Sequence, residues 1–425
     1  MNLAGKEMMR LAEELWPLNR SISGNGLRES LQIFQRERSA LDIKSFKTGS
    51  RAFDWIVPQE WNVMEAYIVK PDGVKICDFS QNNLHLVGYS EPYEGVLNLG
   101  QLKERLHSLP DQPKAVPYVT SYYEKTWGFC ISELEMQSLA EGNYQIVIRS
   151  EFLDSSLEYG ELVVPGQSNR EIFFSTYLCH PSMANNELSG PVLAMELAKQ
   201  VTKLNNFYTY RFVFVPETIG SLAYMAKNLE HMKKHMLAGF VLTCVGDDRE
   251  YSYIPSRSGG TVADSAALST FEELKISPTL YHWRDRGSDE RQYCAPGADL
   301  PVCSVTRSKY GEYPEYHTSF DTLGGVVTAE GLQGSFDFYM AMISKLETQK
   351  FPRMTIVGEP QLGKRGMYPN LSRKGAHSDV AGLMDFISSL DGTLELRRAI
   401  SACGVEEEVA VKFLTRLLEE GLVEY

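Results

Sequence analysis

Between residues 140 and 330, short apolar segments alternate with longer segments of helical periodicity. The apolar segments are 144–149, 161–164, 171–178, 210–215, 238–243 and 300–305, and their length and β-branched or aromatic content are typical of strands. The segments with helical spacing are 190–203, 221–233 and 328–347. Strands that alternate with helices form a mostly parallel sheet that helices cover on both faces. The alternation therefore predicts an α/β fold with a mostly parallel sheet.

Polar side chains follow three apolar segments of this region. His180 comes after 173–178, Glu217 comes after 210–215, and His317 closes a third apolar segment that we interpret as another strand end. In open α/β sheets, ligands bind beyond the carboxyl ends of the strands. One histidine after a strand is more often structural than functional, and a carboxylate there can simply cap a helix. Because all three occur in order, we predict that they meet at one edge of the sheet.

The loop after His180 adds two candidate metal ligands. Asn186 and Glu187 lie just before Ser189, where a new helix is predicted to begin. Imidazole nitrogens and carboxylate oxygens are ligands that zinc prefers in proteins. A histidine at a strand end with polar groups at the next helix start is half of a metal site.

Composition restricts the classes of partner. The net charge of −13 over 425 residues argues against nucleic acid as the main ligand, which requires a basic face. The chain has no apolar stretch long enough for a bilayer, and residues 1–14 lack the apolar core of a secretory signal. Seven scattered cysteines, an odd number, are typical of reduced thiols. We expect a cytoplasmic protein without a membrane partner. Whether the chain forms a homo-oligomer stays open.

The length predicts several domains. We divide the chain into an α/β domain (1–49 and 131–350), an inserted β-rich domain (50–130), a Pro- and Gly-containing linker (351–382) and a C-terminal helical domain (383–425). The insert is rich in aromatic residues, which form either a small β core or a lid over the site. Three short helices and a terminal strand at the C-terminus resemble a winged helix. Its third helix begins with acidic residues 406–408, which favours protein contact or packing over DNA binding.

Together these motifs resemble a known family. The chain resembles the di-zinc aminopeptidases of the bacterial leucyl aminopeptidase and glutaminyl cyclase superfamily in the order of its motifs. These are a strand followed by His180, a small polar loop ending in Ser189-Gly190, a strand ending in Glu217, and the segment His317-Thr-Ser-Phe-Asp-Thr. With the aromatic insert and the winged-helix end, the whole chain more closely resembles an aminopeptidase-like branch of that superfamily. The resemblance implies a phosphorylase/hydrolase-like sheet that carries one or two zinc ions.

The resemblance also implies roles for single residues. His180 matches the first zinc ligand of the family and His317 matches the last. Glu217 matches a pair of adjacent glutamates, of which one is the general base and the other a ligand, but Thr218 takes the second place here. The bridging aspartate falls on Asn186, and a shift of one residue would put Glu187 there instead.

These departures limit the number of metal ions that we expect. The family's other aspartate falls near residues 243–246, where this chain has no carboxylate. Two neighbouring zinc ions need a bridging carboxylate that offsets their repulsion, and an amide supplies no charge. We therefore expect one tightly held zinc, or a second ion that binds weakly, with His180, His317 and either Asn186 or Glu187 as ligands of the tight site.

The resulting expectation is a zinc aminopeptidase that removes an N-terminal amino acid from a small peptide or aminoacyl amide. Glu217 would take a proton from water and return it to the leaving amine. Acidic and phenolic groups of the loops 287–293 and 309–315 are candidate substrate-binding residues, namely Asp289, Glu290, Glu315 and Tyr310. Each acid can equally be a solvated loop charge.

Two other functions on this scaffold stay open: an amidase or deacylase that acts on a sugar-linked or modified amine, and a binding protein that has lost catalysis. A thiol hydrolase requires a Cys–His pair in contact. Side-chain alternation along a strand disfavours Cys179 with His180, whereas Cys244 could still reach it.

Overall fold

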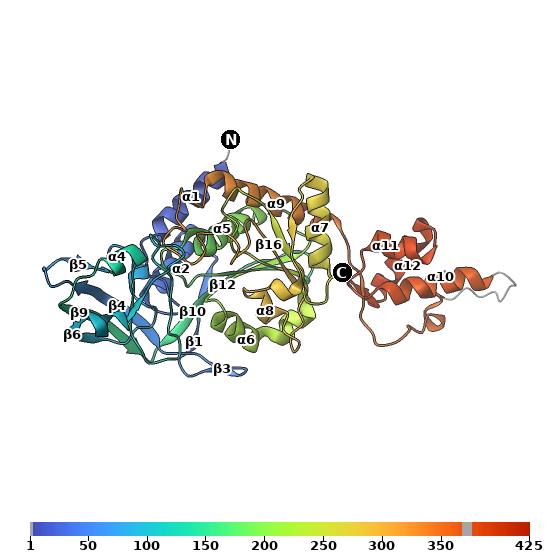
Figure 1. Cartoon of the computed structure of the whole chain (residues 1–425). Helices are drawn as coiled ribbons and strands as arrows, with labels where there is room; N and C mark the ends of the chain where they lie inside the picture. The colour runs from blue at the N-terminus through green and yellow to red at the C-terminus, as the bar shows by residue number, and fades with distance from the viewer. Residues whose placement is uncertain (1–2, 368–375) are drawn as a thin grey trace.

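A central eight-stranded sheet organises the structure, a computed structural model that describes residues 3–367 and 376–425 (Figure 1). In spatial order its strands are β1 (Asp42–Lys47), β10 (Ser156–Val164), β12 (Thr209–Val215), β11 (Glu171–Tyr177), β13 (Met236–Val241), β16 (Val302–Thr306), β14 (Ser252–Ile254) and β15 (Thr279–Leu280). The four adjacent strands β12, β11, β13 and β16 are parallel, whereas β1, β10 and β14 pair antiparallel with neighbours. The carboxyl ends of the parallel strands therefore share one edge.

Helices cover both faces of this sheet, as predicted (Figure 1). One face packs against α1 (Leu3–Leu15), α2 (Asn25–Glu37), α5 (Ser189–Val201), α7 (Val262–Leu274) and α9 (Ala329–Thr348). The other face packs against α6 (Ile219–His235) and α8 (Glu290–Tyr293). Phe174 belongs to the first core and Phe173 to the second, because successive strand residues point to opposite faces. No helix within the two described ranges is both long and apolar enough to traverse a bilayer.

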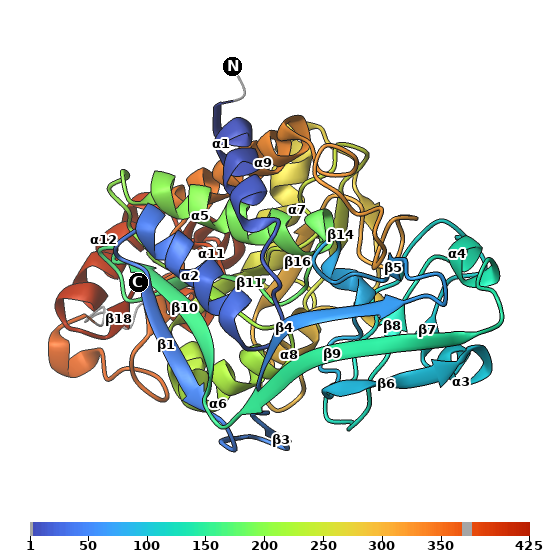
Figure 2. The ribbon, with the colours of Figure 1, turned by 90° about the vertical axis from the view of Figure 1, so that its left-hand side faces the viewer.

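A second, four-stranded sheet lies beside the central one (Figure 2). Its strands in order are β5 (Lys75–Ile76), β4 (Glu60–Val69), β9 (Asn143–Leu153) and β6 (Tyr93–Asn98). The strand predicted at 144–149 is present as β9, but its assignment to the central sheet is wrong, because β9 pairs with β4 and β6. The chain then passes directly from β9 into β10, so the inserted β region continues past residue 130 to Leu153.

Short elements complete this region. They are β2 (Arg51–Ala52), β3 (Trp55–Ile56), η1 (Asn83–His85), α3 (Leu99–Lys103), β7 (Leu106–His107), β8 (Phe129–Cys130), α4 (Glu133–Gln137) and, later in the chain, η3 (Trp283–Asp285).

The C-terminal region forms a separate helical domain at one side of the α/β domain (Figure 1). It contains β17 (Arg353–Met354), η4 (Gly363–Arg365), α10 (Ala376–Ser389), α11 (Leu396–Cys403), α12 (Glu407–Glu419) and β18 (Val423–Glu424). Helix α10 begins inside the predicted linker 351–382, of which 368–375 lie outside the described residues. The domain has its own apolar core around Phe386 and Leu417. Hydrogen bonds connect it to the α/β domain. Arg170 Nη2 donates to the carbonyl oxygen of Gly392 at 3.0 Å, and Ser168 Oγ donates to that of Tyr425 at 2.7 Å.

Candidate metal and catalytic site

The structure brings His180, Glu217 and His317 together. His180 follows β11 and Glu217 follows β12, so both lie at the carboxyl edge of the parallel strands. His180 Nε2 is 3.6 Å from Glu217 Oε2, and the ring centres of His180 and His317 are 5.6 Å apart. The prediction that His317 ends a strand is wrong, because it lies in the loop between β16 and α9 with a φ of 54°. The loop folds back over the sheet edge and places the imidazole there.

These three side chains line a cavity of about 390 Å³. Its other walls include aromatic side chains of the inserted region, which are Trp55, Tyr118, Tyr122 and Tyr123. The Tyr118 ring lies 5.1 Å from the ring of each histidine. Other aromatic residues of the insert, such as Trp61 and Tyr89, are buried in the core. Both alternatives for the aromatic residues therefore apply, since some build the core and others form the wall of the site.

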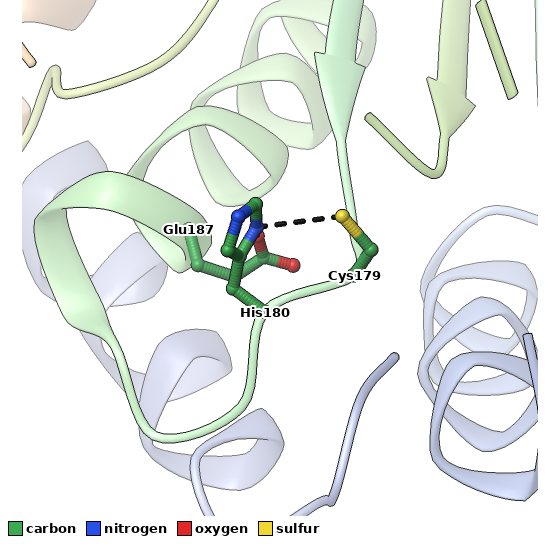
Figure 3. A group of neighbouring side chains, drawn as sticks. All are labelled: Cys179, His180 and Glu187. Carbon is green, nitrogen blue, oxygen red and sulfur yellow. Dashed lines mark hydrogen bonds and ion pairs between the residues drawn. The ribbon is translucent and has the colours of Figure 1, made fainter. Parts of the chain in front are cut away.

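A buried chain of groups supports His180 from the side of Nδ1. Figure 3 shows the side chains of Cys179 and Glu187 next to the His180 imidazole. The Nδ1 atom is 2.8 Å from Glu187 Oε2 and 3.4 Å from Cys179 Sγ. Glu187 belongs to a π-helical turn, η2 (Ala184–Leu188), a distortion that is frequent at functional sites. The fully buried guanidinium of Arg20 lies 3.7 Å from Glu187 Oε1.

This arrangement determines which nitrogen of His180 is available. Burial disfavours a charge on His180, but its contacts with Cys179 and Glu187 raise its pKa well above the ordinary value, so a metal ion has to displace a proton from Nε2. The Glu187 carboxylate that accepts from Nδ1–H then fixes the tautomer. Cys179, His180 and Glu187 also form a compact group whose ligand atoms lie within 4.8 Å of one another. We assign this group to the support of His180, because Glu187 already binds Nδ1 and the cationic Arg20 would repel a metal ion there.

His180 and His317 are the candidate metal ligands on the Nε2 side of His180, and Asn186 is a third candidate from the neighbouring turn. His317 Nε2 and Asn186 Oδ1 are buried without a hydrogen-bond partner. Burial and the nearby His180 lower the pKa of His317 to about 3, so its imidazole is neutral, as a ligand must be. Two imidazoles on one tetrahedral zinc have ring centres about 5 Å apart, given Zn–N bonds of about 2.0 Å. The observed 5.6 Å between His180 and His317 matches this geometry.

The site holds fewer acidic donors than the resemblance implies for a bridged pair of zinc ions. Asn186 Nδ2 donates to Tyr177 Oη (2.8 Å), so the side chain offers only its neutral Oδ1. Thr218 and Thr243 occupy the regions where the resemblance places further acidic ligands. Glu187 lies on the Nδ1 side of His180.

Glu217 is placed for proton transfer. Burial raises its pKa, and the nearby charges of His180 and Arg291 act in the opposite direction. A partly buried carboxylate in this position can accept a proton from water and pass it to a leaving group.

The predicted substrate acids on the first loop lie outside the cavity wall. Asp289 is buried, and its Oδ1 accepts from Thr218 N and Ser221 Oγ, both at 2.8 Å. Glu290 Oε1 accepts from Gly287 N at 2.9 Å and from the Tyr310 hydroxyl. These carboxylates and this phenol hold the loop in place.

Glu315 also lies away from the cavity wall. Its carboxylate forms a two-pronged ion pair with Arg249, with contacts of 2.8 and 2.9 Å. The substrate-binding role that we predicted for Asp289, Glu290, Tyr310 and Glu315 therefore has no support from their placement.

The two candidate thiols, Cys179 and Cys244, are not in a state that supports thiol catalysis. Cys179 Sγ does contact His180, contrary to the alternation argument, because β11 already ends at Tyr177. Burial raises the pKa of Cys179 to about 11 and that of Cys244 to about 12, so both thiols are protonated at neutral pH. The nucleophile in thiol catalysis is the thiolate.

Sequence reasoning missed two supporting residues. Asp321 accepts hydrogen bonds from the backbone N–H groups of Asn185 (2.7 Å) and Asn186 (2.9 Å), which ties the loop after His317 to the candidate ligand Asn186. Asp321 belongs to the His-Thr-Ser-Phe-Asp motif, so its position was visible although its role was not. Arg20, between α1 and α2, carried no local signal.

Sequence comparison places the chain in a family. The profile of a domain of unknown function, DUF4910, matches residues 9–349. The chain belongs to the DUF4910 family. A second profile, winged helix-turn-helix, matches residues 350–425 and confirms the winged helix at the C-terminus. A family relative from Clostridium acetobutylicum, named "Putative polysaccharide biosynthesis protein with aminopeptidase-like domain", is 40% identical over 365 residues, which are 86% of this chain and 83% of the relative.

Solved structures show the fold of the family. The crystal structure of a "putative peptidase" from Clostridium acetobutylicum is 36% identical, with a TM-score of 0.81 over 100% of this chain and 97% of that one. The zinc aminopeptidase BSAP from Bacillus subtilis is 14% identical, with a TM-score of 0.59 over 81% and 94%. An aminopeptidase from Aneurinibacillus sp. is 14% identical, with a TM-score of 0.52 over 80% and 93%. The predicted aminopeptidase-like fold is confirmed.

Proposed function

We propose that the protein is a metal-dependent hydrolase that cleaves a C–N amide bond, with one zinc ion bound by Nε2 of His180 and Nε2 of His317. The observation that carries this proposal is the buried, unpartnered Nε2 of His317, a residue that lines the same cavity as the His180–Glu217 pair. When bound, zinc supplies a Lewis acid that polarises a carbonyl and acidifies a water molecule.

The chain's own residues then perform the proton transfers. The carboxylate of Glu217 accepts a proton from water and delivers it to the nitrogen of the leaving amine. Glu187 holds His180 in the required tautomer through the Nδ1 hydrogen bond. The aromatic wall formed by Tyr118 and Tyr122 reduces access of bulk water to these groups.

Two substrate classes follow from the fold and the cavity. Aminopeptidases with this fold suggest an N-terminal amino acid on a small peptide or aminoacyl amide. An amidase or deacylase that acts on a modified amine is favoured by a specific observation: Glu217 is the one carboxylate among the described residues that line the cavity. The name of the Clostridium relative is compatible with a sugar-linked amine.

Metal analysis with three variants tests the proposal. We expect about one zinc per wild-type chain and loss of zinc in His317→Ala, whereas His235→Ala, which removes a half-buried histidine of α6 outside the cavity, keeps the metal. Glu217→Gln should retain zinc and lose roughly 10²- to 10⁴-fold in kcat on any amide that the wild type hydrolyses. Metal-free wild-type protein after gentle purification and zinc supply would contradict the proposal.

A further inference from the structure

The charges on the cavity wall indicate what kind of substrate the cavity accepts. Apart from the two imidazoles, its charged lining side chains within the described residues are Glu217 and Arg291. An enzyme that recognises a substrate ammonium group needs an acid for it, and Glu217 is required for proton transfer. The neighbouring Asp289 is buried behind Thr218 and receives hydrogen bonds from within the protein. The cavity therefore lacks a free acidic partner for an ammonium group.

Arg291 instead offers a positive charge next to the reacting groups. It lies on α8, and its Nη2 donates to Thr218 Oγ1 at 2.7 Å, which places the guanidinium beside the residue that follows Glu217. Within residues 3–367 and 376–425, no carboxylate lies within 4 Å of the Arg291 guanidinium, although its charge acts on the nearby Glu217 and Asp289. A guanidinium has five N–H donors in a planar fork that matches a carboxylate, and most of them are available here.

Aromatic side chains face the same cavity. Trp55 and Tyr123 lie edge to face with ring centres 5.8 Å apart, and both are partly exposed. The Tyr123 hydroxyl donates to the Ile56 carbonyl oxygen at 3.0 Å, which joins the β2–β3 hairpin to the loop that carries Tyr122. Rigid aromatic faces bind flat or cyclic groups at low entropic cost.

We propose that the cavity recognises amides that carry a carboxylate close to the scissile bond and a ring-bearing body, with the carboxylate on Arg291 and the ring against Trp55 and Tyr123. The hydrolysis of such a compound rests on the proposed function; its recognition does not. In the reaction the oxygen of water bonds to the carbonyl carbon and the C–N bond breaks. One proton passes through Glu217 to the leaving nitrogen, so the products are a carboxylic acid and an amine.

Binding of three matched probes to the full chain tests this inference by titration calorimetry. N-acetylphenylalanine carries a carboxylate, N-acetylphenylalaninamide is neutral, and phenylalaninamide carries an ammonium group. We expect the carboxylate probe to bind about tenfold or more tightly than the neutral one, because hydrogen bonds to charged groups are the stronger kind. Arg291→Gln should remove this preference and leave the affinity for the neutral probe unchanged.

Arg286→Gln is the matched control, because Arg286 is an exposed arginine of the same segment that stacks on Trp283 instead of lining the cavity. It should keep the preference. Equal binding of the three probes, absence of binding by the carboxylate probe, or an unchanged preference in Arg291→Gln would overturn the inference.

The same probes separate this inference from the proposed function. Binding of the carboxylate probe through Arg291 without hydrolysis of any amide would refute the hydrolase and retain the recognition. Hydrolysis of phenylalaninamide with no preference for a carboxylate would retain the hydrolase and refute the recognition.

Discussion

At the scale of single residues, the pair of Arg20 and Glu187 is the least expected feature of the site. Both side chains are fully buried, and Arg20 Nη1 also donates to the Leu15 carbonyl oxygen at 2.5 Å. Removing one partner of a buried ion pair leaves an uncompensated charge. Arg20→Met should therefore lower the free energy of unfolding by about 3–5 kcal/mol, measured by urea denaturation.

The double variant Arg20→Met/Glu187→Gln is the control for this prediction. It removes both charges and should recover a large part of the lost stability. If the double variant is as unstable as the sum of the two single variants, the two side chains do not interact and the supporting role of Arg20 is refuted.

A second residue prediction concerns pH. Burial and the nearby charge of Glu217 together raise the pKa of Asp289 from 3.8 to about 7. Because the native state binds this proton more tightly than the unfolded state does, the free energy of unfolding should fall as pH rises from about 4 to 7, by up to about 4 kcal/mol. In metal-free Asp289→Asn this part of the pH dependence should be absent. Urea denaturation at pH 5 and pH 7.5 checks it; equal pH dependence in both proteins would contradict it.

Residue-level sequence reasoning succeeded where a side chain is tied to a strong local pattern. His180 and Glu217 follow two long apolar segments, and adjacent parallel strands bring such ends together. The substrate acids failed because a loop carboxylate can bind substrate or its own backbone, and only the folded loop shows which. Arg20 lies far in sequence from Glu187, so no local pattern could pair them.

At the scale of elements, the close approach of α5 to the sheet positions the candidate ligands. A Cβ on Gly190 would lie 2.2 Å from the Leu242 carbonyl oxygen and 2.5 Å from Thr176 Oγ1. Gly190→Ala should therefore push α5 away, lower the free energy of unfolding by about 1–3 kcal/mol and weaken zinc binding, because Asn186 lies just before α5.

Gly297→Ala provides the control, because a Cβ at Gly297 meets no atom within 4 Å. It should change neither property. Zinc affinity of Gly190→Ala equal to that of wild type, measured by competition with a chelator, would refute the link between helix packing and ligand position.

The alternation of strands and helices predicted most elements of the central sheet correctly. The short strands β14 and β15 were not predicted, and β9, which was assigned to the wrong sheet, shows the limit of local patterns. An apolar strand segment has the same appearance in either sheet, and its pairing depends on β4 and β6, which are distant in sequence.

At the scale of the whole molecule, the winged helix has a core of its own, separate from the two cores of the α/β domain. The winged helix contacts the α/β domain through hydrogen bonds of Ser168, Arg170 and Arg353 and through the rings of Phe207 and Tyr425. This interface is small, so the two domains should unfold independently. Calorimetry on the full chain should show two transitions, of which only that of the α/β domain shifts to higher temperature with zinc. One transition with equal calorimetric and van't Hoff enthalpies would contradict this expectation.

The measurement that tests the central claim most directly is an anomalous difference map at the zinc absorption edge, from crystals of the protein grown with zinc. The account predicts one peak, bound by Nε2 of His180 and Nε2 of His317, beside the carboxylate of Glu217. A peak on the Nδ1 side between Cys179 and Glu187, or the absence of a peak between the two imidazoles, would contradict it.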